Sequence, residues 1–152
     1  MQDQRTLPEP LPPLPCACAS IRRASRAVTQ YYGRALRNSG LEITQFTLLQ
    51  VLSRTGERTQ GDLAELLAMD STTLTRSLAP MLKHEWIVVR PGRDRRQKLF
   101  RLTPKGSKAM EPVLRTWEHV QADLLQVMGD DEWRTLMESL DRVTQATREQ
   151  NN

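Results

Sequence analysis

The fold is decided by residues 62–106, which read DLAELLAMDSTTLTRSLAPMLKHEWIVVRPGRDRRQKLFRLTPKG. The first half of this stretch predicts two helices separated by a tight turn. Thr59 and Asp62 resemble a capping box that starts a short helix. Asp70 or Ser71 then caps a second helix. We expect the apolar residues at helical spacing to point inward: Leu63, Leu66 and Leu67 from the first helix, and Leu74, Leu78, Met81 and Leu82 from the second.

The second half of the stretch predicts a basic β-hairpin. Residues 86–90 and 98–103 are short and rich in β-branched and aromatic side chains, a composition typical of strands. Between them, residues 90–100 hold four arginines and a lysine around Asp94. A short helix, a tight turn, a second helix and a hairpin in this order predict a winged helix-turn-helix.

Helical spacing continues on both sides of the stretch. Upstream, apolar residues recur over residues 16–37, and Thr44 can cap a further helix. Downstream, Pro104 opens a long helix, Gly129 breaks it, and Asp130 can cap a last one. The predicted fold class is mainly α with a small β-hairpin wing, a winged helix-turn-helix domain plus N- and C-terminal helices.

Basic charge is concentrated in one segment of the chain. The net charge is only +4, but residues 80–110 carry nine basic and two acidic side chains, whereas residues 111–152 carry four and nine. A local positive field of this kind suits a polyanion, most commonly nucleic acid. Polar side chains on the front of the second helix, opposite its leucines, can enter a major groove and bond to phosphates and base edges. These are Ser71, Thr72, Thr73, Thr75 and Arg76.

Residues 62–106 resemble the MarR family of bacterial transcription regulators (multiple antibiotic resistance regulators). The resemblance rests on an Asp-x-Arg wing, here Asp94-Arg95-Arg96, and on a Leu-Thr-x-x-Gly helix start, here residues 102–106. With the flanking helices it covers about residues 18–148. It implies a homodimer whose terminal helices intertwine, and a wing arginine that enters the minor groove of double-stranded DNA.

The residues of the wing have distinct expected roles. Arg96 is expected to reach into a narrow minor groove, where the negative potential is enhanced. Asp94, two residues before it, can accept a bidentate bond from that guanidinium and hold it in place. Arg93, Arg95 and Lys98 are then expected to bind phosphates and position the wing. The alternative is a solvated charged turn.

The terminal helices carry more apolar surface than a monomer of this size can bury, which favours a homodimer. Two recognition helices about 34 Å apart match one turn of DNA and read a palindromic operator. Four parts are therefore expected: a flexible proline-rich arm over residues 1–15, an N-terminal dimerisation helix over 16–43, the DNA-binding lobe over 44–106, and C-terminal dimerisation helices over 107–152.

Cys16 and Cys18 are open to several interpretations. They can be small residues packed in a dimer seam, thiols that sense an oxidant, or ligands of a soft metal or arsenical bound across the dimer. Positions two apart in a helix point to roughly opposite sides, so a disulfide is expected to link two chains. An alternative effector is a small aromatic or phenolic acid lodged between the dimer helices and the DNA-binding lobe.

Other classes of function fit less well. Two cysteines and two histidines without metal-ligand spacing predict no metal site and no cofactor, and they disfavour a thiol-dependent enzyme. An RNA-binding or non-specific nucleic-acid-binding module usually exposes stacking aromatics, and the chain has only two phenylalanines and two tyrosines. No window approaches the ~18 apolar residues of a membrane span, and the N-terminus lacks a signal-peptide pattern, so we expect a cytoplasmic protein.

The sequence therefore predicts a sequence-specific regulator of transcription that binds double-stranded DNA and is not an enzyme. We expect a ligand- or redox-responsive repressor.

Overall fold

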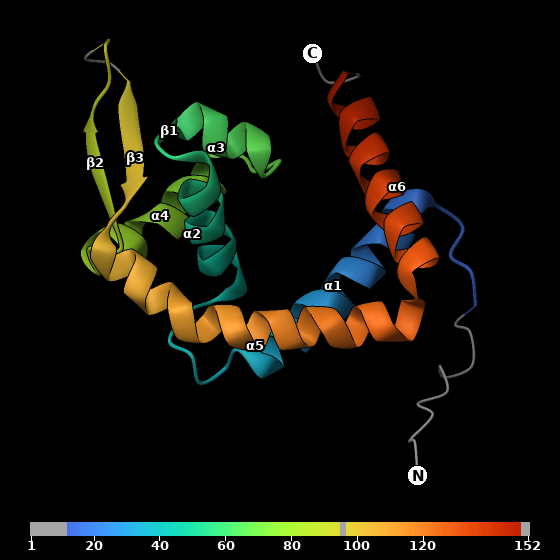
Figure 1. Ribbon diagram of the computed structural model, residues 1–152. Coiled ribbons are helices and arrows are strands. Elements are labelled where there is room, and N and C mark those ends of the chain that lie inside the picture. The colour runs from blue at the N-terminus through green and yellow to red at the C-terminus, as the bar shows by residue number, and fades with distance from the viewer. Residues whose placement is uncertain (1–11, 95–96, 150–152) are drawn as a thin grey trace. The chain divides into compact units, whose positions relative to one another are not determined.

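The computed structural model describes residues 12–94 and 97–149, in which helices and three short strands alternate along the chain (Figure 1). This confirms the mainly α fold class with a small wing. The elements in chain order are α1 (Ala17–Ala35), α2 (Ile43–Thr55), β1 (Arg58–Thr59), α3 (Gln60–Leu66), α4 (Ser71–Lys83), β2 (Ile87–Pro91), β3 (Lys98–Leu102), α5 (Pro104–Met128) and α6 (Asp130–Glu149).

The chain divides into two compact units. Tyr32–Trp117 forms the first, which we call the winged-helix unit. The described residues up to Tyr31 and from Glu118 onward form the second, the terminal-helix unit.

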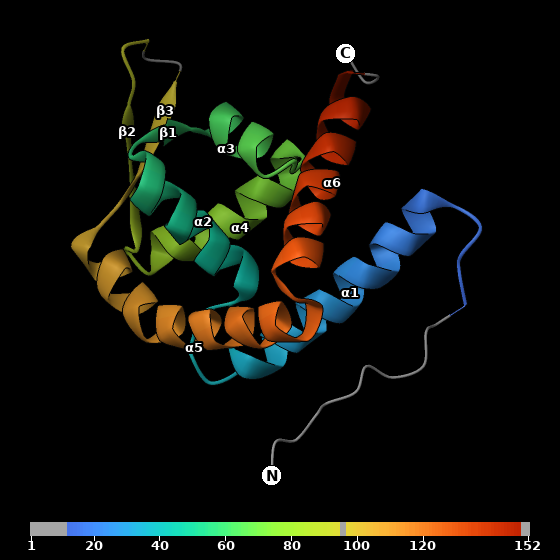
Figure 2. The same ribbon diagram turned by 45° about the vertical axis from the view of Figure 1, so that its right-hand side comes forward.

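The sheet of the winged-helix unit has three antiparallel strands in the order β1-β3-β2. β2 and β3 form the predicted hairpin, which begins with Ile87 opposite Leu102. β1 was not predicted. It adds two residues along the other side of β3, with Arg58 opposite Phe100. In the turned view α2, α3 and α4 pack together beside this sheet, so the hairpin projects from a helical body (Figure 2).

Side-chain caps fix both helices of the helix-turn-helix. The Thr59 hydroxyl accepts the N–H of Asp62, and the Asp62 carboxylate accepts the N–H of Thr59, which completes the predicted capping box. Asp70, rather than Ser71, caps α4 by accepting the N–H of Thr73 at 2.9 Å. The backbone bond from Thr59 lowers the pKa of Asp62, and the bond from the Thr73 hydroxyl lowers the pKa of Asp70.

Two predicted caps were wrong. α2 is capped by Glu42, whose side chain forms a capping box with Gln45, so Thr44 lies inside the helix. Asp130 is the first residue of α6 instead of its cap, because the carbonyl of Gly129 already accepts the first helical N–H bond. Both shifts leave the helices themselves where periodicity predicts them.

Leu66 was also predicted wrongly, since 55% of it is exposed. Leu63 and Leu67 lie one turn apart and occupy the side of α3 that meets the core. The core cluster of the described residues belongs to the winged-helix unit. Its largest fully buried side chains are Phe46, Leu48, Leu49, Leu52, Leu63, Leu74, Met81 and Val113.

The Leu-Thr-x-x-Gly motif joins the start of α5 to the base of the hairpin. The Thr103 hydroxyl donates to the carbonyl of Glu85 at 2.7 Å and accepts the N–H of Gly106 at 3.0 Å. A Cβ on Gly106 would overlap the carbonyl oxygen of Trp86, so only glycine fits there. Lys105 binds the Glu85 carboxylate at 2.8 Å, and this hydrogen bond lowers the pKa of Glu85.

Candidate nucleic-acid interface

The front of α4 faces solvent, as predicted. Leu74 and Leu78 are buried on the opposite side and fix the rotation of the helix about its axis. The five predicted contact residues are all exposed and lie within the first two turns: Ser71, Thr72, Thr73, Thr75 and Arg76. The structure therefore brings these residues together on one surface.

The hydroxyls of this surface divide into two groups. Thr73 donates to the Asp70 carboxylate at 2.6 Å. Thr75 donates to the carbonyl of Ser71 at 2.7 Å and accepts from the side-chain amide of Gln60, on α3, at 2.9 Å. Thr73 thus stabilises the cap of α4, and Thr75 links α4 to α3.

The remaining side chains of the α4 front are available to a ligand. Within the described residues, Ser71, Thr72 and Arg76 make no side-chain hydrogen bond or ion pair. The first backbone N–H groups of a helix also carry a partial positive charge that favours anions. Two hydroxyls, one guanidinium and a helix N-terminus form a surface suited to phosphates and base edges.

Backbone hydrogen bonds join the described residues on the two sides of the hairpin tip. Gly92 donates its N–H to the Gln97 carbonyl at 2.8 Å, and Gln97 donates to the carbonyl of Asp94 at 2.9 Å. Arg93, Asp94 and Lys98 are exposed, as expected. Arg95 and Arg96 lie outside the described residues, so the bond from Arg96 to Asp94 stays a prediction.

The base of the hairpin contains an acidic residue that no sequence pattern indicates. Glu57 lies between α2 and β1, and its carboxylate accepts a hydrogen bond from Nη2 of Arg90 on β2. The same carboxylate oxygen lies 3.9 Å from Nε of Arg101 on β3. Its partners are far along the chain, so neither periodicity nor local spacing reveals this cluster.

The two cysteines lie at the start of α1. Cys16 precedes the helix, and its sulfur accepts the N–H of Ala19 at 3.3 Å, whereas Cys18 belongs to the first turn. Both are exposed and carry free thiols. The prediction of a disulfide between chains assumed that both residues are helical, and Cys16 does not meet this condition.

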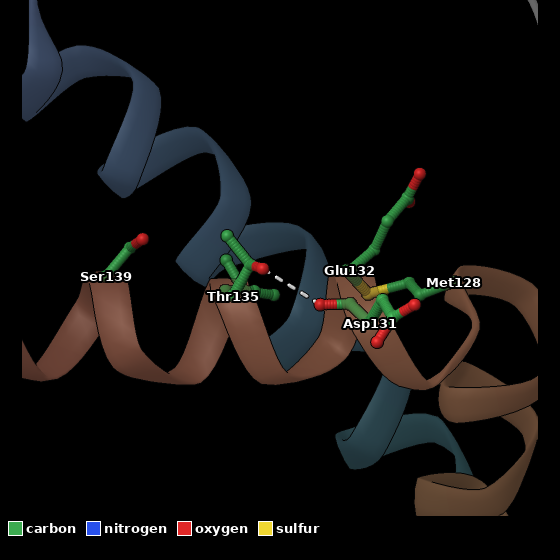
Figure 3. A pocket seen from close by; sticks show the side chains of 6 residues that line it. Met128, Asp131, Glu132, Thr135 and Ser139 are labelled. Carbon is green, nitrogen blue, oxygen red and sulfur yellow. Dashed lines mark hydrogen bonds between the residues drawn. The ribbon is translucent and has the colours of Figure 1, made fainter.

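A shallow hollow of about 500 Å³ lies on the terminal-helix unit, where α5 ends and α6 begins (Figure 3). Asp131 and Glu132 line it, and the carbonyl of Asp131 accepts a bond from the Thr135 hydroxyl at 2.9 Å. Aromatic and phenolic acids are anions, which these two carboxylates repel. The hollow is therefore an unfavourable place for such an acid, and the aromatic effector expected between the dimer helices and the DNA-binding lobe stays a prediction.

Residues 12–94 and 97–149 contain neither a membrane-spanning helix nor a cluster of metal-ligating side chains. None of the helices there has the length and apolar character needed to cross a bilayer. The same residues contain no cluster of three or more histidine, cysteine or acidic side chains that could hold a metal ion.

The cap-fixed helix pair, the exposed front of α4 and the basic hairpin define a winged helix-turn-helix of the kind found in transcription regulators. Comparison with known proteins agrees, since residues 39–97 match the family model described as MarR family. The chain belongs to the MarR family of transcription regulators, as its wing and α5 motifs indicate.

Individual relatives show how far the likeness extends. The Mycobacterium tuberculosis transcriptional regulator MosR, solved in complex with DNA, is 38% identical with a TM-score of 0.78, covering 88% of this chain and 96% of that one. A variant of MarR from E. coli with operator DNA is 23% identical with a TM-score of 0.74, covering 83% of this chain and 91% of that one, and shows a common fold.

A curated relative is the uncharacterized HTH-type transcriptional regulator YwoH of Bacillus subtilis (strain 168). It is 26% identical over 112 residues, which are 74% of this chain and 82% of YwoH.

Proposed function

We propose that this protein represses transcription by binding a palindromic operator in double-stranded DNA as a homodimer. The observation that carries the proposal is the exposed polar front of α4, where Ser71, Thr72 and Arg76 face solvent in the same unit as a basic hairpin. The structures of MosR and MarR with DNA support it as relatives of the same fold.

In this proposal α4 enters the major groove. Arg76 donates to a guanine edge, while Ser71, Thr72 and the first N–H groups of the helix bond to phosphates. Thr73 and Thr75 act indirectly, since their hydroxyls bind Asp70, Ser71 and Gln60 and so fix the angle at which α4 is presented.

The wing contacts the neighbouring minor groove. Arg96 enters the groove and Asp94 orients its guanidinium, while Arg93, Arg95 and Lys98 bind phosphates on either side. Arg93, Asp94 and Lys98 are exposed, as these roles require.

The second copy needed for a palindrome binds through the terminal-helix unit. α6 buries none of its described residues, although Leu136, Met137, Leu140 and Val143 recur on one face. On α1, 45% of Val28 is exposed. Burial against another helix stabilises apolar stripes of this kind. In a homodimer the second copy of the chain provides that helix.

The signal that releases DNA acts, we propose, through the N-terminal thiols. The Cys16 sulfur accepts the N–H of Ala19 at the start of α1, and both thiols are exposed and so accessible to an oxidant. Diamide should then release DNA and dithiothreitol should restore binding. The double Cys16→Ser, Cys18→Ser variant should bind DNA and ignore diamide. If the wild type keeps its DNA under diamide with both thiols still titratable, the thiols are not sensors.

The DNA-binding proposal is tested by fluorescence anisotropy with duplexes of equal length. The wild type should bind a DNA duplex selected from a randomised pool more tightly than an RNA duplex, with an affinity that falls steeply with salt. Arg76→Ala should weaken binding about tenfold and relax the sequence preference, because a bidentate base contact is lost.

Arg115→Ala serves as the matched control, since Arg115 is exposed on α5 away from the α4 front. It should bind the selected duplex like the wild type. Equal affinity for RNA and DNA, or an Arg76→Ala variant with unchanged affinity and preference, would contradict the proposal.

A further inference from the structure

The register of the sheet places Glu57 on the outer face of the hairpin base. Arg58 lies opposite Phe100, so Glu57, one residue earlier, is level with Arg101. Arg101 lies opposite Val88 on β2, and Arg90 is two residues closer to the tip on the same face. A carboxylate thus stands beside two arginines from the two strands of the wing.

This acidic residue spans the sheet. β1 pairs only with β3, yet the Glu57 side chain reaches past β3 to bind Arg90 on β2. The side chain of Glu57 is 28% exposed, and those of Arg90 and Arg101 are 51% and 53% exposed. The cluster therefore links the far strand of the hairpin to the segment between α2 and β1, at a solvated surface.

The arginines keep most of their hydrogen-bonding capacity in this arrangement. A guanidinium has five N–H donors, and one carboxylate occupies only part of them. One negative and two positive charges leave the cluster positive overall, so a phosphate can join as a second acceptor. An exposed ion pair of this kind contributes little to stability, which gives the fold itself little need of Glu57.

We propose that Glu57 is a positioning residue for DNA binding. It holds Arg90 and Arg101 toward a phosphate of the DNA backbone and fixes the angle between the hairpin and α4. The inference rests on the proposed DNA-binding function and deepens it. It assigns the base of the wing a phosphate contact in addition to those expected at its tip.

The diagnostic variant is Glu57→Gln in the full-length protein. Its affinity is measured for the duplex that the wild type selects from a pool of randomised duplexes, each about 30 base pairs long. Removal of a negative charge near DNA should tighten binding if charge alone matters. Loss of positioning should instead weaken binding by about threefold to tenfold, while the melting temperature shifts by less than about 3 °C. Glu111→Gln, which removes an exposed charge on α5, should leave affinity nearly unchanged.

A double-mutant cycle shows whether Glu57 acts through its partner. In an Arg90→Gln background the effect of Glu57→Gln should shrink to less than about twofold, since the guanidinium that it orients is gone. Full additivity of the two effects, or tighter binding by Glu57→Gln, overturns the inference.

A measurement without DNA separates this inference from the proposed function. Amide hydrogen exchange in residues 87–90 and 98–102 of the free protein should become about threefold faster in Glu57→Gln and not in Glu111→Gln. Unchanged exchange overturns the positioning role even if DNA binds. A wild type that binds no duplex overturns the proposed function, whatever the exchange rates are.

Discussion

The winged-helix unit and the terminal-helix unit differ in how far they bury their apolar side chains. In the first, Phe46 and Leu74 are fully buried in a core that also contains Trp117 at its edge. In the second, 40% of Leu140 and 45% of Val28 are exposed, and α6 buries none of its described residues. One unit is complete within a single chain, and the other presents a surface that association would complete.

This difference separates two tasks that the same chain must perform. A rigid core keeps the α4 front and the hairpin in a fixed arrangement, as reading a base sequence requires. An apolar helical surface supplies the symmetry that a palindrome requires. Substitutions in the core of the winged-helix unit should therefore lower the free energy of unfolding. Substitutions in the apolar faces of the terminal-helix unit should weaken association.

The largest effect is expected from Gly106→Ala in the winged-helix unit. The added methyl group would overlap the Trp86 carbonyl and separate α5 from the base of the hairpin. The free energy of unfolding should fall by about 3 kcal/mol or more, as measured by urea denaturation.

Gly33→Ala is the matched control, since nothing lies within 4 Å of a Cβ there. This helical site should gain about 0.5–1 kcal/mol from the added methyl. Equal stability of the two variants would contradict the close approach at Gly106.

Leu140→Asp should act on association instead of stability. A charge in an apolar seam occurs twice in a symmetric dimer, so the dissociation constant should rise about a hundredfold in sedimentation equilibrium. Glu138→Ala, roughly half a turn away on α6, should leave it nearly unchanged. An equal response of the two variants would place the dimer seam elsewhere.

The wing offers a smaller effect with an informative sign. Arg96→Ala should weaken binding to the selected duplex about tenfold in anisotropy titrations, because the minor-groove contact is lost. Asp94→Ala should also weaken it, by about threefold, although it removes a negative charge. Tighter binding by Asp94→Ala would refute its orienting role.

The smallest effect concerns the caps of the helix-turn-helix. Asp62 and Asp70 have pKa values below the ordinary 3.8 because they accept hydrogen bonds in the fold. Their contribution is therefore present above pH 3.8 and is lost as the pH falls through the lower folded values. Asp70→Asn should keep the cap and show a smaller loss of urea midpoint on acidification. An acid response identical to that of the wild type would contradict this role of Asp70.

Local signals in the sequence predict most of the fold. Thr59 with Asp62 starts α3, and helical spacing predicts the burial of Leu74 and Leu78, because these features depend on residues one turn apart. The Leu-Thr-x-x-Gly motif was recognised as a family feature, but its reason, the Trp86 carbonyl against Gly106, is a tertiary contact.

Long-range pairing explains what the sequence does not predict. β1 has only two residues, too few for a period, and it exists because β3 offers an open edge. Glu57 meets Arg90 across the sheet, and Gln60 meets Thr75 across the helix-turn-helix. Among the predicted contact residues, the structure shows that the hydroxyls of Thr73 and Thr75 already make hydrogen bonds within the protein. The spacing of residues in the sequence cannot show this.

The claim that the terminal-helix unit forms a dimer is tested most directly by multi-angle light scattering, which measures the molar mass of the wild type at micromolar concentration. A dimer through the terminal-helix unit predicts twice the 17.4 kDa mass of one chain, without further growth as the concentration rises. A compact species of 17.4 kDa would contradict it, because the apolar faces of α1 and α6 would then be stable in water without a second copy.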